Sequence, residues 1–119
     1  MESKRQQRIS KLIQHDLGEI FLREVPHLTP GVMVTVTKVH VTPDLALAKV
    51  YISLFPTKDK KALLAGIHKA SREVRGLLGQ RVRHQLRAIP ELRFYLDDSL
   101  DYIEKIDKLL HEDENETKE

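Results

Sequence analysis

Basic side chains are concentrated in one stretch of this 119-residue chain, and they are the residues best suited to chemistry. Between residues 67 and 93 there are seven Lys or Arg residues and only two Glu residues. Arginine, which predominates, forms paired hydrogen bonds with phosphate oxygens. Such a stretch can bind a polyanion even though the formal net charge of the whole chain is only +2. The pattern therefore favours recognition of phosphate groups.

The sequence Gly76-Leu77-Leu78-Gly79, inside the basic stretch, raises the possibility of a nucleotide clamp. A glycine–x–x–glycine loop holds nucleotides through exposed backbone N–H groups. The middle positions here are leucines, and exposing Leu78 would forfeit about 1.5–3 kcal/mol of burial. We therefore expect a helix in which the two glycines allow close packing or bending, and we keep the clamp as the less favoured alternative.

We predict that two basic clusters contact RNA. When residues 60–89 are drawn as one helix, four cations gather opposite the leucines, and Arg75 lies between the two faces. The first helix carries the second cluster, to which Lys11 also belongs. A solvated helix face is the alternative, although such faces commonly mix both signs of charge. The predicted RNA-binding residues are Lys69, Arg72, Arg75, Arg83, Arg87, Arg5, Arg8 and Lys4.

Aromatic side chains are few, with three Phe and three Tyr residues. Phe94 alternates with leucines and is expected in the core. Tyr51 and Tyr95 fall on outward positions of predicted strands, where either ring could stack on a base. Because aromatic residues are few and Phe94 is expected in the core, RNA binding should depend more on phosphate and shape than on base readout.

Catalytic and metal-binding patterns are missing from the sequence. The six histidines show neither H-x-x-x-H nor H-E-x-x-H spacing, and the chain has no cysteine. There is no G-x-S-x-G sequence and no P-loop. Asp97-Asp98-Ser99 is explained as the start of a helix, because Ser and Asp cap free backbone N–H groups. We predict no enzyme activity, no metal and no cofactor.

Three helical segments are predicted from apolar residues that recur three and four positions apart. The first runs from Ser3 to Glu24, and its Ser3 and Gln6 have the spacing of a capping box. The second runs from about residue 60 to Pro90 and is long enough that we expect a kink or break inside it. The third covers residues 99–110.

Strands are predicted over residues 32–41, 47–55 and 92–96, where β-branched or alternating apolar residues occur. The first two are joined by a short Pro-Asp turn and should pair as an antiparallel hairpin. A bulge near Thr37-Lys38 would place the valines on both sides of it in the core. The result is an α+β domain in which a three-stranded sheet packs on helices.

The chain is predicted to hold one domain, residues 1–110, followed by an acidic, disordered tail over residues 111–119. No apolar run approaches the roughly 18 residues of a membrane span. The N-terminus is charged and lacks the apolar segment of a signal peptide. We expect a cytoplasmic monomer without membrane association.

Three motifs resemble the bacterial ribosome-binding factor A family. They are Asp44–Ser53 (DLALAKVYIS), Val74–Gly79 (VRGLLG) and Pro90–Ser99 (PELRFYLDDS). The likeness extends from the first helix to about Ile103. The predicted order of elements is also that of a type II KH domain, so the resemblance implies a type II KH-like fold with an additional C-terminal helix.

The resemblance also implies where a kink in the long helix should lie. In that family a helix–kink–helix with an A-x-G sequence replaces the glycine-rich loop of KH domains. The matching positions are Ala70, Ser71 and Arg72. An arginine thus stands where the family has glycine, which disfavours a sharp kink and adds a positive charge where a phosphate can approach.

The function implied by the resemblance is assembly of the 30S ribosomal subunit. Such a protein would bind 16S rRNA in the free small subunit and assist late rRNA processing, with no small-molecule substrate. The alternative is a non-catalytic interaction module that uses the same basic face to bind an acidic protein.

Overall fold

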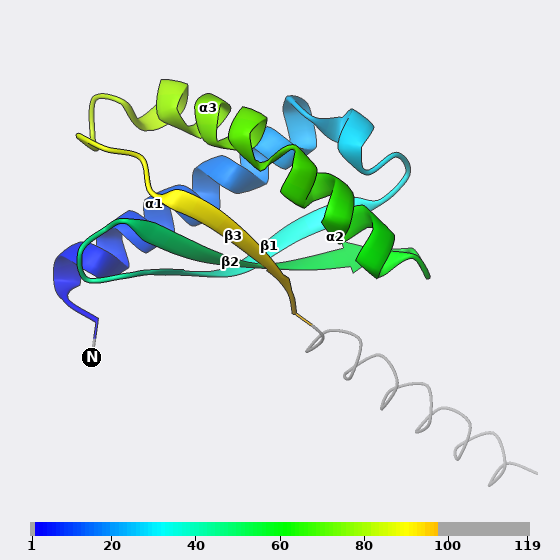
Figure 1. Cartoon of the computed structure of the whole chain (residues 1–119), viewed down its shortest axis with the longest axis horizontal. Coiled ribbons are helices and arrows are strands. Elements are labelled where there is room, and N and C mark those ends of the chain that lie inside the picture. Colours follow the sequence, from blue (N-terminus) through cyan, green and yellow to red (C-terminus); the bar gives the residue numbers. More distant parts are fainter. Residues whose placement is uncertain (1, 98–119) are drawn as a thin grey trace, which may run out of the picture.

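The computed structural model describes residues 2–97, in which helices cover one face of a three-stranded sheet (Figure 1). The elements are α1 (Lys4–Arg23), the 3-10 helix η1 (Pro26–Leu28), β1 (Met33–Val41), β2 (Leu47–Phe55), α2 (Lys60–Lys69), α3 (Ser71–Val82) and β3 (Glu91–Leu96). This order confirms the α+β prediction and is that of a type II KH domain. The predicted helix over residues 99–110 and the tail over 111–119 lie outside the described residues.

Helix α1 begins and packs as its sequence predicts. The Ser3 side chain accepts a hydrogen bond from the Gln6 N–H, and the Gln6 side chain accepts one from the Ser3 N–H, which completes the capping box. Ile13, Leu17 and Ile20 lie on the face turned toward the sheet and are fully buried. The helix lies mainly against β1.

The sheet has the order β1-β2-β3, with β1 antiparallel and β3 parallel to β2. The parallel pairing is possible because α2 and α3 carry the chain from the end of β2 back to the start of β3. The predicted bulge is confirmed, since Val36 pairs with Ile52 and Lys38 with Tyr51, which leaves Thr37 as the extra residue. The bulge lets Val36 and Val39 both turn inward, where they are 8% and 5% exposed.

The predicted break in the long helical pattern occurs at Ala70, between α2 and α3. Ala70 has φ −91° and ψ 6°, and its N–H bonds back to the carbonyl groups of Gly66 and Ile67. A negative φ of this size is open to any L-residue, so the break needs no glycine. Arg72 lies two residues later, in the first turn of α3, and the expectation that it disfavours a sharp kink stays a prediction.

The predicted helix is too long at its C-terminal end, because α3 ends at Val82 and not at Pro90. The Gln85 and Leu86 N–H groups both bond to the Val82 carbonyl, and the chain then folds back. Ile89 thereby reaches the core through a loop, not through a longer helix. Arg87 consequently lies in the loop after α3, and the prediction that it continues a single helical stripe of cations is wrong.

The glycine–x–x–glycine sequence lies within the continuous helix α3, so the nucleotide clamp is wrong. Leu78 is fully buried. Gly79 supports the packing explanation, because a Cβ atom there would lie 3.4 Å from Cγ1 of Ile89. Gly76 is not required for close packing, since a Cβ atom there would meet nothing within 4 Å.

The two glycines should respond differently to alanine. Gly76→Ala should raise the free energy of unfolding by about 0.5–1 kcal/mol, because alanine favours the helix and the added methyl group has open space. Gly79→Ala should gain less, because its methyl group must fit against Ile89. Urea denaturation followed by circular dichroism measures both. A less stable Gly76→Ala protein would contradict the helical environment described for Gly76.

Candidate nucleic-acid interface

The structure brings three of the predicted residues together in one groove, although they come from distant parts of the sequence. Arg5 and Arg8 lie in the first turns of α1, and Arg87 lies in the loop between α3 and β3. The turn between β1 and β2 closes the groove, whose volume is about 430 Å³. We call it the arginine groove; its lining residues are Arg5, Arg8, Ile9, Asp44, Leu45, Gln85, Leu86, Arg87, Ala88 and Pro90.

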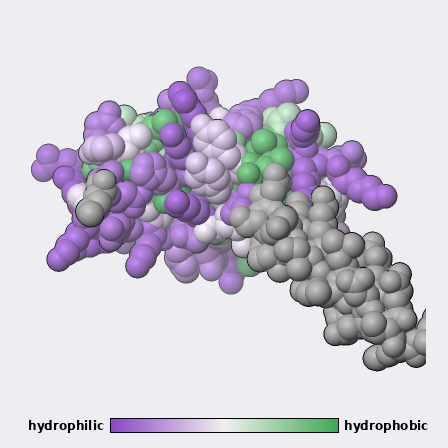
Figure 2. Space-filling view, turned by 90° about the horizontal axis from the view of Figure 1, so that it is seen from below, coloured by the Kyte–Doolittle hydropathy of each residue, from purple (hydrophilic) through white to green (hydrophobic). Residues whose placement is uncertain are grey.

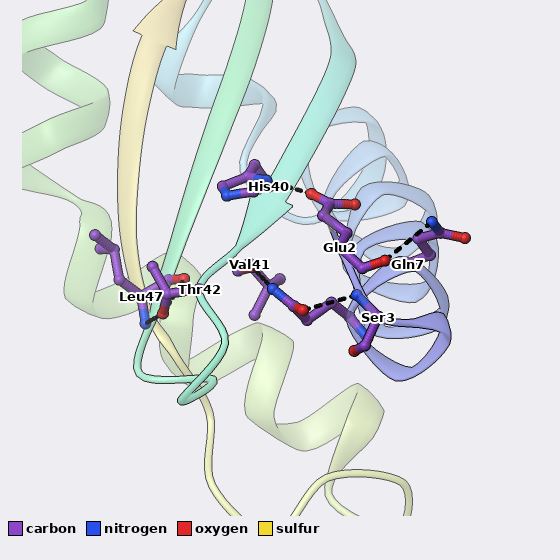
Figure 3. Close-up of polar contacts among 8 residues, drawn as sticks. Glu2, Ser3, Gln7, His40, Val41, Thr42 and Leu47 are labelled. Atoms are coloured by element: carbon purple, nitrogen blue, oxygen red, sulfur yellow. Dashed lines mark hydrogen bonds and ion pairs between the residues drawn. The ribbon is translucent and has the colours of Figure 1, made fainter.

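The N-terminal end of α1 is held against β1 by polar contacts, and Figure 3 shows Glu2 and Ser3 beside His40 and Val41. Nε2 of Gln6 donates a hydrogen bond to the Val41 carbonyl over 2.9 Å, while its Oε1 accepts one from the Ser3 N–H. An ion pair between Glu2 and His40 joins the same two segments. Gln6 is only 6% exposed, so losing its partners would leave a buried amide unsatisfied. These bonds place the neighbouring Arg5 beside the turn that follows β1.

That turn contributes the carboxylate of the arginine groove. The Thr42 hydroxyl donates a hydrogen bond to Asp44 Oδ1 over 2.6 Å, and the Ala46 N–H donates to the same oxygen over 3.1 Å. These two hydrogen bonds stabilise the ionised carboxyl group and hold the pKa of the exposed Asp44 below its ordinary value. The bond from the Thr42 hydroxyl has the larger effect, and the bond from the Ala46 N–H has the smaller one. Leu45, with φ 60°, adopts a left-handed conformation that is uncommon for leucine, and its side chain packs against the core.

Arg75 has a structural partner that its sequence position did not predict. Its Nε donates to the Pro90 carbonyl over 3.1 Å and its Nη2 donates to the Ile89 carbonyl over 2.6 Å. Both bonds fix the end of the loop that carries Arg87. Arg75 thus does not line the arginine groove, but it holds in place the loop whose Arg87 does.

A second, smaller pocket lies at the break between α2 and α3. Its volume is about 220 Å³, and its lining residues are Ser71, Arg72, Arg75, Glu91 and Leu92. It adjoins the arginine groove, because Pro90 lines the groove and Glu91 lines this pocket. We call it the break pocket.

The other predicted residues lie outside both cavities. Lys4, Lys69 and Arg83 are exposed at the start of α1, the end of α2 and the end of α3. Lys11 lines a different groove, between α1 and β1, of about 600 Å³. Asp44 and Gln85 also line the groove, although neither was predicted to do so. The Thr-Pro-Asp sequence indicates a turn at Asp44, whereas no sequence pattern marks Gln85.

Arg81 joins two helices. Its Nε lies 3.1 Å from Oε2 of Glu24 and its Nη1 lies 3.6 Å from Oδ1 of Asp16, both on or beside α1. The side chain, 30% exposed, therefore links α3 to α1. This pairing explains why a cation occurs at the apolar edge of α3.

Within residues 2–97, no three His, Asp or Glu side chains come together as metal ligands. None of the helices in that part of the chain combines the length and apolar character needed to cross a membrane.

Comparison with known proteins identifies the family. The model of the ribosome-binding factor A family matches residues 5–110. The chain belongs to this family. It is 47% identical over 116 residues to ribosome-binding factor A of Flavobacterium johnsoniae, covering 97% of this chain and 89% of that protein. It is 44% identical over 110 residues to that of Cytophaga hutchinsonii, covering 92% and 83%.

Solved structures of ribosome-binding factor A have the same fold. The crystal structure from Thermus thermophilus is similar with a TM-score of 0.61 at 25% identity, over 76% of this chain and 94% of that one. A Thermus thermophilus model fitted into a cryo-electron microscopy map of a 30S–ribosome-binding factor A complex gives 0.59 at 26% identity, over 75% and 91%. The resemblance recognised from the three motifs is confirmed.

Removing Arg75 should loosen the loop more than it removes an RNA contact. Arg75→Ala should lower the free energy of unfolding by about 1 kcal/mol, because two carbonyl groups lose a charged donor. Arg75→Lys should recover only part of this loss, since one ammonium group cannot reproduce two separated N–H donors. Urea denaturation tests both variants. Unchanged stability together with weakened RNA binding would assign Arg75 to the RNA instead.

The carboxyl group of Asp44 should titrate below its ordinary pKa of 3.8. Because the folded-state pKa is lowered, the ionised group stabilises the fold above its unfolded-state pKa, and this contribution is lost as the pH falls through the folded-state pKa. Thr42→Val removes the largest cause and should move the pKa toward its ordinary value. Carbon-detected NMR follows the titration; an unchanged pKa in Thr42→Val would exclude the hydroxyl as its cause.

Proposed function

We propose that this protein is a non-enzymatic assembly factor of the small ribosomal subunit that binds 16S rRNA through the arginine groove and the break pocket. The observation that carries the proposal is the convergence of Arg5, Arg8 and Arg87 in one groove. Membership of the ribosome-binding factor A family supports it. So does the similarity to the Thermus thermophilus protein that was fitted into a complex with the 30S subunit.

The groove suits a folded RNA backbone. Three guanidinium groups supply fixed, planar sets of N–H donors for phosphate oxygens. Gln85 offers both a donor and an acceptor to a ribose 2′-hydroxyl group. The ionised Asp44 repels phosphate from the turn, so it limits where along the groove a phosphate can bind. Arg72, at the break pocket, would extend this surface along α3.

The role that follows is to hold an rRNA segment during late processing of 16S rRNA. The protein would bind the free small subunit and leave before translation begins. We place this activity in the cytoplasm, with the protein acting as a monomer and without a cofactor. The division into a ribosome-binding domain, residues 1–110, and a tail, residues 111–119, stays a prediction.

Charge reversal in the arginine groove should abolish association with free small subunits. Arg5, Arg8 and Arg87 are changed together to Glu, and co-sedimentation with purified small subunits is measured at low salt. The matched control changes Arg23, Lys58 and Lys61 to Glu, which alters the net charge equally at exposed positions outside the groove. The control should bind nearly as the unaltered protein does.

Salt dependence gives a second measurement of the same contacts. Each single Arg→Ala change in the groove should reduce the slope of log affinity against log salt by about 0.7–0.9, because one fewer counterion is released. Association that survives the triple reversal would place the interface elsewhere. Association that excess bulk RNA cannot compete away would instead favour an acidic protein partner.

A further inference from the structure

The face of the sheet turned away from the helices carries a stacked pair of tyrosines. Tyr51 of β2 and Tyr95 of β3 are register partners, with ring centroids 5.4 Å apart and ring planes inclined by 28°. Their neighbours in each strand, such as Val50 and Phe94, point the other way and are buried. Tyr95 is 38% exposed, a large fraction for an aromatic side chain. The rings therefore belong to the solvent side of the sheet.

Three cations surround this pair. Lys38 of β1 is the register partner of Tyr51, and Lys49 and Arg93 pair with each other one row away on the same face. We call these five residues the tyrosine face. Figure 2, which views the molecule from below Figure 1, shows pale residues near the centre of this side, with hydrophilic residues around much of them and a hydrophobic patch next to them.

Arg93, one of the three cations of the tyrosine face, lies beside a carboxylate. Oε1 of Glu91 is 4.0 Å from Nε of Arg93, and both side chains are more than half exposed. An exposed pair at that distance contributes little and exchanges readily for another anion. Asp97 lies beyond Tyr95 and accepts a hydrogen bond from the Thr37 hydroxyl.

We propose that the tyrosine face binds an unpaired RNA strand, whose bases stack on Tyr51 and Tyr95 and whose phosphates contact Lys38, Lys49 and Arg93. Aromatic rings on an open sheet flanked by cations are the combination that holds single-stranded nucleic acid. Within residues 2–97, β3 is an edge strand, and no strand of that part of the chain lies beyond the outer face of Tyr95. A base can therefore extend the existing stack of two rings.

An acidic peptide is a poorer match for the same face, because it would use the three cations but has no base to place on the rings. The identification of the RNA as ribosomal rests on the proposed function. The inference that the tyrosine face binds an unpaired RNA strand is independent of it, because the tyrosine face and the arginine groove share no residue. A folded rRNA segment in the groove and an unpaired strand on the sheet are thus separate contacts.

The experiment measures binding of the full chain to a fluorescein-labelled oligouridylate of about ten nucleotides, using anisotropy, with duplex RNA of equal length for comparison. The double variant Tyr51→Leu/Tyr95→Leu should lose roughly tenfold or more in affinity for the single strand, the effect of losing one stacked base. Its affinity for duplex RNA should change much less. Tyr51→Phe/Tyr95→Phe keeps both rings and should bind as the unaltered protein does.

The matched control is Phe55→Leu, the same kind of change at another exposed aromatic residue of β2, and it should leave affinity unchanged. Equal single-strand affinity in the double leucine variant would overturn the proposal, as would equal losses for single-strand and duplex RNA. If the leucine variant does not fold, ultraviolet crosslinking of the unaltered protein to oligouridylate tests whether the tyrosine face binds the single strand. Crosslinks at Tyr51 or Tyr95 support the proposal, and their absence rejects it.

The two proposals fail separately. If the arginine-groove reversal abolishes small-subunit association while the leucine variant binds oligouridylate normally, only the tyrosine face is excluded. If the unaltered protein does not associate with small subunits but binds oligouridylate through its tyrosines, only the proposed function is excluded.

Discussion

Burial of one face of the three-stranded sheet is the constraint on which the rest of the structure depends. Val50, Ile52 and Phe94 are almost completely buried under the helices, and this burial is the main favourable term for so small a domain. It accounts for the bulge at Thr37, which turns the valines on both sides of it inward. The same constraint leaves the opposite face of the sheet open, where polar and aromatic side chains can serve recognition.

The constraint also explains the break between α2 and α3. Ile67 lies before the break and Val74 and Leu78 lie after it, and all three are fully buried. The break at Ala70 lets both segments contact β3. Beyond Val82 the chain must return to begin β3 parallel to β2, and the loop that does so carries Ile89 into the core and Arg87 to the arginine groove.

Cations that look alike in the sequence have different tasks in the fold. Arg81 forms ion pairs with α1, and Arg75 binds two loop carbonyl groups, so both hold elements together. Arg5, Arg8 and Arg87 instead converge on a shared cavity. Arg75 and Arg81 are bonded to carbonyl or carboxylate oxygens of another part of the chain, and local charge density along the sequence does not reveal such bonds. A basic segment thus predicts a binding role without identifying the residues that perform it.

Local physical chemistry in the sequence determined the elements and the family. The capping box of Ser3 and Gln6, the alternation along β2 and the bulge near Thr37 each depend on residues close together in the chain. Only the tertiary structure decided where α3 ends, because an apolar Ile89 at helical spacing can reach the core through a helix or through a folded loop. It also decided the arginine groove and the tyrosine face, since both are made by residues from separate elements whose approach depends on packing.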